Sequence, residues 1–95
     1  GVTSYCDITS DPVYVDIYRE LRDAGEMTAR VRVRPPLDRW NAMADLGLKV
    51  GFGDDWSRFG AVKAWIDGIR GNSSARFFVP YTQDPESRGS WRVIV

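Results

Sequence analysis

Two stretches of the chain carry apolar residues at helical spacing, and each has a recognisable stop signal. The first begins at Asp11-Pro12, a good N-cap residue followed by the residue that best fits a first helical position, and ends at Gly25. The second occupies residues 37–47 and ends at Gly47. The apolar stripes are Val13, Ile17, Leu21 and Ala24 in the first stretch, and Leu37, Trp40, Met43 and Ala44 in the second. This spacing predicts two amphipathic helices, each with one buried side.

Three other stretches have the pattern of strands. Residues 2–8 and 28–34 are the first two, and Pro35-Pro36 ends the second. Residues 61–67 are the third, with the aliphatic residues on one face. The order strand, helix, strand, helix, strand predicts two βαβ units and therefore parallel strands. The expected fold class is α/β, with about three parallel strands, two helices and an irregular segment after Gly68.

The third predicted strand raises a chemical question. Its second face carries Lys63 and Asp67 on either side of Trp65. A strand rarely places charges in this way without a partner or a function. Asp7 also lies near the end of its predicted strand. Charged ends on parallel strands indicate a site at the C-terminal edge of the sheet.

Composition narrows the classes of function. Thirteen basic and thirteen acidic residues cancel in a chain of 95 residues, so we expect neither a nucleic-acid partner nor a membrane surface. The single cysteine, Cys6, excludes an internal disulfide framework, and a reducing, cytoplasmic location is the default. No histidine occurs. The chain alone therefore cannot build a zinc site, a Ser-His-Asp triad or a Cys-His dyad.

Several blocks of the chain are similar to one enzyme family. The blocks are "GVTSYCD", "GFGDDWSRFGAVKAWIDG" and "SSARFFVPYTQDPESRG". They resemble a segment of the metal-dependent amidohydrolases, in particular the YtcJ-like branch that includes N-substituted formamide deformylases. The resemblance implies a distorted TIM barrel, of which residues 1–95 are a single partial domain that holds barrel strands two to four. A full barrel takes about 250 residues, so the chain would be its middle segment.

The resemblance also implies a function for the full-length protein, the hydrolysis of non-peptide C–N bonds in amides or formamides. In that family a lysine on the fourth barrel strand can be carboxylated and bridge two metal ions, and Lys63 stands at the matching position. The implied cofactor is a divalent metal, zinc, in the full-length enzyme, and Asp7, Trp65 and Asp67 become candidates for the substrate pocket. The family's histidine ligands come from other strands, so the resemblance implies no catalytic residue and no metal for this chain alone.

Structural roles for the same charged residues stay open. Lys63 can pair with Asp67, or with Asp7 on the neighbouring strand. Asp54 and Asp55 are neighbours in the loop before the third predicted strand, and capping of a turn is favoured for them over metal binding.

Two further features have ordinary structural interpretations. Cys6 suits a small, buried apolar position. Arg30, Arg32 and Arg34 alternate on one strand face, and salt bridges to the aspartate-rich loops are favoured for them over phosphate binding.

A parallel sheet of this size has exposed edges and needs cover on both faces. We therefore expect the edges to be buried by the remainder of the barrel or by a second copy of the chain, as a homo-oligomer. The alternative to a hydrolase fragment is a stand-alone, non-catalytic α/β module that acts through self-association or docking to a partner.

Overall fold

The computed structural model describes residues 1–8 and 11–92. The contacts divide the chain into two compact units, Gly1–Lys63 and Ala64–Val95, and each unit is described by itself. The strands and α-helices of the described residues all belong to the first unit.

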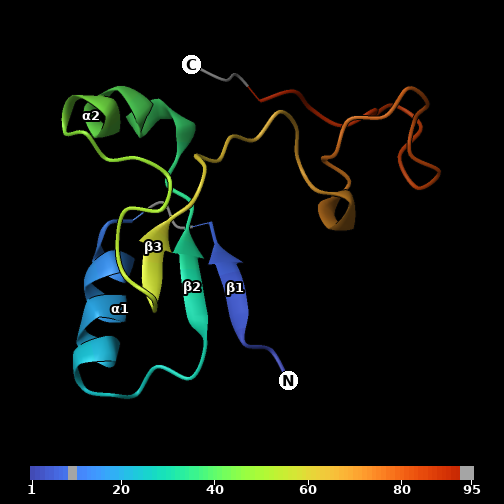
Figure 1. Cartoon of the computed structure of the whole chain (residues 1–95). Helices are drawn as coiled ribbons and strands as arrows, with labels where there is room; N and C mark the ends of the chain where they lie inside the picture. The colour runs from blue at the N-terminus through green and yellow to red at the C-terminus, as the bar shows by residue number, and fades with distance from the viewer. Residues whose placement is uncertain (9–10, 93–95) are drawn as a thin grey trace. The chain divides into compact units, whose positions relative to one another are not determined.

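The first unit is built on a sheet of three parallel strands in the order β1-β2-β3 (Figure 1). The strands are β1 (Ser4–Asp7), β2 (Arg30–Val33) and β3 (Ser57–Phe59). Strands that are neighbours in space therefore follow one another in the chain. This confirms the predicted small α/β fold with three parallel strands and two helices.

Helix α1 (Val13–Asp23) connects β1 to β2, and both of its predicted end signals operate. The Asp11 carboxylate accepts a hydrogen bond from the backbone N–H of Val13 at 2.9 Å. At the other end, Gly25 has a φ of 72°, a conformation that favours glycine. Its N–H donates to the carbonyl of Arg22 at 2.9 Å, which closes the last turn.

The second crossover contains the short 3-10 turn η1 (Leu37–Arg39) and the helix α2 (Trp40–Asp45), which lie at the carboxyl ends of the strands (Figure 1). Gly47 ends this crossover helix with a φ of 71°, as predicted. The buried sides predicted for the two helices do not form within the described residues: no residue of α1, η1 or α2 is buried, and the Trp40 side chain is 53% exposed.

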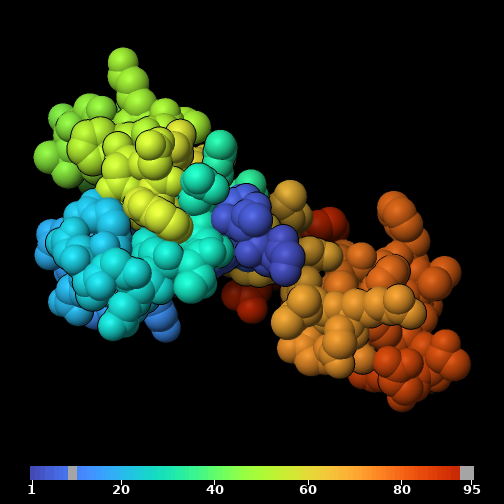
Figure 2. All heavy atoms as spheres, turned by 60° about the horizontal axis from the view of Figure 1, so that its bottom comes forward, coloured from blue at the N-terminus to red at the C-terminus, as the bar shows by residue number. Residues whose placement is uncertain are grey.

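The core of the first unit is small. Val31 and Val33 of β2 are buried, with 1% and 3% of their surface exposed. They point to the face of the sheet that α1 covers, and Figure 2 shows the blue-to-cyan atoms of the N-terminal part packed against the yellow atoms around β3. Among the described residues, large apolar side chains such as Ile17, Trp40 and Phe52 remain at least 40% exposed. The first unit therefore buries little of its own apolar surface.

The third strand lies earlier in the chain than the sequence pattern predicts. Residues 61–67 form no strand, and Lys63 makes only an isolated parallel bridge with Pro36. The cause lies in the segment opposite, because Pro35 and Pro36, which come one residue after the end of β2, have no N–H to donate to a ladder. One pairing remains: the N–H of Lys63 donates to the Pro35 carbonyl, and the N–H of Leu37 donates to the Lys63 carbonyl, both at 2.8 Å.

The two edges of the sheet differ. Residues 51–54 run antiparallel beside β3, where Gly53 bridges Arg58 and the N–H of Phe59 donates to the Phe52 carbonyl at 2.8 Å. The loop before β3 therefore covers the outer edge of this strand. Strand β1 pairs with β2 alone and is the open edge of the described sheet.

The second unit consists mainly of turns around the short 3-10 turn η2 (Arg70–Asn72). Asp67 forms an isolated antiparallel bridge with Trp91, and the Tyr81 hydroxyl donates to the Ala75 carbonyl at 2.6 Å. The irregular C-terminal segment predicted from the sequence is thus confirmed for the described residues after Gly68.

Candidate functional site

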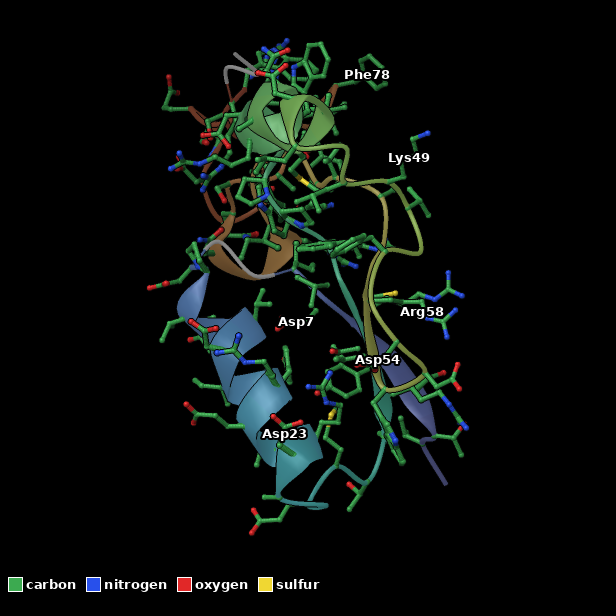
Figure 3. All side chains as sticks on the ribbon, turned by 60° about the vertical axis from the view of Figure 1, so that its left-hand side comes forward. Asp7, Asp23, Lys49, Asp54, Arg58 and Phe78 are labelled. Atoms are coloured by element: carbon green, nitrogen blue, oxygen red, sulfur yellow. The ribbon has the colours of Figure 1, made fainter. Side chains whose placement is uncertain are left out.

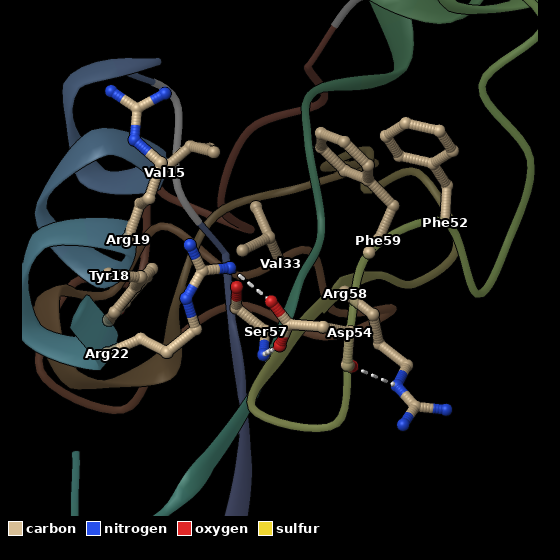
Figure 4. Close-up of a pocket in the computed structure, with 11 residues that line it drawn as sticks. Val15, Tyr18, Arg19, Arg22, Val33, Phe52, Asp54, Ser57, Arg58 and Phe59 are labelled. Carbon is tan, nitrogen blue, oxygen red and sulfur yellow. Dashed lines mark hydrogen bonds and ion pairs between the residues drawn. The ribbon is translucent and has the colours of Figure 1, made fainter. Parts of the chain in front are cut away.

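A hollow of about 150 Å³ lies between α1 and the sheet (Figure 4). Its lining includes Tyr18, Arg22, Val33, Asp54, Ser57 and Phe59. The aliphatic and aromatic groups come from α1, from β2 and β3 and from the loop before β3, and the charged groups come from α1, from that loop and from β3. Its chemistry therefore depends on how these charged groups are paired.

Asp54 is the carboxylate that lines this hollow. It accepts hydrogen bonds from the backbone N–H groups of Trp56 at 2.7 Å and Ser57 at 2.9 Å. It also forms an ion pair with Arg22 of α1, marked in Figure 4. The Ser57 and Trp56 amides, followed by the guanidinium of Arg22, hold the pKa of Asp54 below its ordinary value. The turn-capping role predicted for Asp54 is confirmed.

The neighbouring carboxylate, Asp55, has a different environment. Its side chain is 95% exposed and contacts the guanidinium of Arg58 at 3.2 Å. The two adjacent aspartates thus diverge, and Figure 3 shows Asp54 on the side of the sheet that faces α1.

Tyr18 provides a second polar link between α1 and the sheet. Its hydroxyl donates to the carboxylate of Asp7 at 2.5 Å, and its ring meets Tyr5 edge-on at a centroid distance of 6.4 Å. Burial and then the hydrogen bond to Asp7 raise the pKa of Tyr18 well above its ordinary value. Asp7, predicted as a pocket residue, is therefore engaged with a tyrosine of the crossover helix.

The two links fix α1 to β1 through Tyr18 and to the loop before β3 through Arg22. Sequence reasoning missed both contacts. The available signal was that Tyr18 and Arg22 are four residues apart, which places them on one side of a helix. Because its main polar groups already pair with one another, this hollow serves to position the helix.

A second hollow, of about 300 Å³, lies at the carboxyl ends of β2 and β3. Its lining includes Asp11, Val33, Pro35, Arg39, Met43 and Phe59. An acidic and a basic side chain thus flank an apolar floor at the edge where parallel α/β folds bind ligands. The size is at the lower end for a small-molecule site, which starts at about 300 Å³. This hollow is the candidate binding site of the first unit.

The structure does not bring the four predicted site residues together in one unit. Asp7 and Lys63 belong to the first unit, whereas Trp65 and Asp67 belong to the second. Asp67 accepts a hydrogen bond from the backbone N–H of Arg76 at 2.9 Å. Within residues 1–8 and 11–92, no three Asp, Glu or Cys side chains form a group that could hold a metal ion. The carbamate role of Lys63 and the zinc of a full-length protein stay predictions that these contacts do not test.

Two structural expectations are wrong. Cys6 is exposed rather than buried, because its side chain is on the sheet face opposite α1. The alternating arginines form no salt bridges to the aspartate-rich loop. Instead, the Arg30 guanidinium lies over the Trp56 ring at 5.7 Å, and the loop aspartates pair with Arg22 and Arg58.

No helix in the described part of the chain has the length and apolar character needed to cross a membrane.

The fold and its hollows define a small parallel α/β segment. No family model and no solved structure matches the chain. Among curated proteins, it is similar to Protein LONG AFTER FAR-RED 3 of Arabidopsis thaliana, with 31% identity over 100 residues. The alignment covers 94% of this chain and 17% of the plant protein, so the chain spans only a small part of that protein's length.

These comparisons contradict the resemblance to amidohydrolases. They return no amidohydrolase family, and the plant protein carries a name that designates no hydrolase. The expectation that the full-length protein hydrolyses C–N bonds is therefore wrong. The match gives no support to the alternative of a stand-alone, non-catalytic module either.

Proposed function

We propose that the chain is a segment of a larger parallel α/β domain, to which it contributes three neighbouring strands and part of a small-molecule site at their carboxyl ends. The observation that carries the proposal is the open edge of β1, which pairs with β2 alone. Proteins rarely leave a strand edge uncovered, because its free N–H and C=O groups recruit other chains. A further strand of the same polypeptide beside β1 removes this liability.

The small core supports the same proposal. Val31 and Val33 are the buried apolar residues of the described chain, and α1 covers only one face of the sheet. Parallel sheets occur almost only with both faces covered. A larger domain supplies that cover and buries exposed side chains such as Ile8 and Val62.

A closed barrel is the finer form of this proposal. Its support is that β1, β2 and β3 are adjacent in chain order, as the strands of a barrel are. A closed barrel also needs a neighbouring strand on the outer side of β3. Residues 51–54 already pair with Ser57–Phe59 on that side. We therefore place the next strand beside β1. On the side of β3, a partner strand has access only to the residues that follow Gly60.

The hollow between Asp11 and Arg39 gives this segment its part in function. It lies at the carboxyl edge, and the starts of α1 and α2 flank it. In a larger sheet the loops of neighbouring strands close over such an edge and complete a ligand site.

The native mass of the protein that carries this chain in its source tests the proposal. We expect one polypeptide several times heavier than the 10.8 kDa of these residues. A folded monomer of 10.8 kDa with a sharp unfolding transition contradicts the proposal. An assembly of 10.8 kDa chains also overturns it, because a second copy would then cover β1.

A further inference from the structure

The sheet face opposite α1 has an unusual composition. Because Val31 and Val33 face α1, the alternating residues Arg30 and Arg32 lie on the other face. Arg34 continues this row, since both it and Arg32 flank the position where a side chain on Gly60 would stand. Three guanidinium groups therefore follow one another along the central strand.

The neighbouring strands add to this row. Arg58 of β3 is directly opposite Arg32, and Cys6 of β1 is opposite Arg32 on the other side. Figure 3 shows the Arg58 side chain pointing away from α1. Like charges directly opposite each other on neighbouring strands are unfavourable. The face thus holds a repulsion that a bound anion relieves.

The available carboxylates leave this positive charge largely uncompensated. On this face, Asp55 contacts only Arg58, at 3.2 Å, and is itself 95% exposed. Asp54 is turned to Arg22 on the α1 side. The side chains of Arg32 and Arg34 make no hydrogen bond, ion pair or ring contact with residues 1–8 or 11–92. Both side chains are exposed in the described part of the chain, so this inference rests on the proposed larger domain leaving them open to a ligand.

We propose that Arg32 and Arg34, with Gly60 beside them, form a binding site for a doubly charged oxyanion, the group that phosphate and dicarboxylate ligands share. Guanidinium groups present planar donor pairs that match such oxygens. Gly60 is buried against the aliphatic stems of the two arginines, where an added Cβ would lie 3.4 Å from Arg34 Cγ and 3.8 Å from Arg32 Cβ. This site lies outside the hollow of the proposed small-molecule site and needs only the three strands.

Calorimetric titration of the native protein, in its full natural polypeptide and at constant ionic strength, tests this inference. Inorganic phosphate is the phosphate probe and succinate is the carboxylate probe, so the two arms identify the source of the oxyanion. We expect saturable binding of one probe, weakened about tenfold or more in Arg32→Gln and in Arg34→Gln, because each loses a charge-assisted hydrogen bond. Arg32→Lys keeps the charge and should recover part of the affinity.

Arg19→Gln is the matched control. It removes the same charge from the exposed surface of α1, where Arg19 contacts only Asp16 at 3.1 Å. Binding should be unchanged in this variant. If neither probe binds, or if Arg19→Gln weakens binding as much as Arg32→Gln does, the inference is overturned. The native mass is measured separately, so a protein several times heavier than 10.8 kDa that binds neither probe overturns this inference and leaves the proposed larger domain standing.

Discussion

Replacement of Asp54 by alanine should loosen the contact between β2 and β3. The Asp54 carboxylate accepts backbone hydrogen bonds at 2.7 and 2.9 Å from the two residues that lead into β3. Loss of such capping bonds costs about 1–2 kcal/mol. The ion pair with Arg22 adds little, because both side chains are about one-third exposed and solvent screens the charges. A cost of ~1.5 kcal/mol corresponds to an opening equilibrium constant about tenfold larger.

Amide hydrogen exchange in the native protein measures this opening at two reporters. The N–H of Val31 donates to the Trp56 carbonyl at 2.8 Å, and the N–H of Gly60 donates to the Val33 carbonyl at 2.7 Å, so both bonds join β2 to the β3 segment. Both amides should exchange about tenfold faster in Asp54→Ala.

Asp55→Ala is the matched control, because Asp55 is the adjacent residue and is 95% exposed. It should leave both exchange rates unchanged. Equal acceleration in the two variants, or none in Asp54→Ala, would refute the capping role. The pKa of Asp54 is lowered, so its contribution is present above the ordinary aspartate pKa of about 3.9 and is lost as pH falls through the lower folded value.

The remaining predictions concern Tyr18 and two glycines. Tyr18→Phe should destabilise the first unit, because the variant loses the hydrogen bond to Asp7. Since the pKa of Tyr18 is raised, its contribution is complete below the ordinary tyrosine pKa of about 10 and declines as pH rises above it. The difference in stability between wild type and variant, followed by urea denaturation from pH 8 to 11, should therefore shrink at the alkaline end; a constant difference argues against the assignment. Gly53→Ala should be far more destabilising in thermal melts than Gly51→Ala. Both have positive φ, but an added Cβ collides with the Ser57 carbonyl only at Gly53. Similar melting temperatures for the two variants would contradict the close approach.

The local elements were predictable because their signals are short in range. Asp11 and Gly25 bound α1 through contacts within a few residues, and Gly47 ends the second helix in the same way. The alternation of valine and arginine fixed which face of β2 is buried. Helical spacing and strand alternation were therefore sufficient to predict the α/β fold class.

Longer-range features were not predictable from the pattern. Residues 61–67 alternate like a strand, but the prolines opposite them have no N–H groups to form a ladder. The third strand is therefore formed by the shorter segment Ser57–Phe59. The contact between Arg22 and Asp54 joins residues 32 positions apart. Nothing local specifies such a pair. The exposed Cys6 follows from strand register, which the sequence alone did not fix.

In the proposed larger domain, another strand of the same polypeptide pairs with the outer edge of β1. The Thr3 and Asp7 carbonyls accept hydrogen bonds from the backbone N–H groups of Arg30 and Arg34 at 2.9 and 2.7 Å. In a strand, the N–H and C=O of one residue point toward the same side, and successive residues point to alternate sides. The backbone N–H and C=O groups of the odd-numbered residues of β1 therefore point toward β2. The N–H group of Cys6 therefore faces outward.

Residue-resolved hydrogen exchange on the native protein tests this claim directly. Tyr5 and Asp7 are internal controls, because their N–H groups face β2. We expect the N–H groups of Ser4 and Cys6 to be as strongly protected as those of the two controls. Exchange of Ser4 and Cys6 at the rate of an unstructured peptide, with Tyr5 and Asp7 still protected, would show that β1 is a true edge and would contradict the claim.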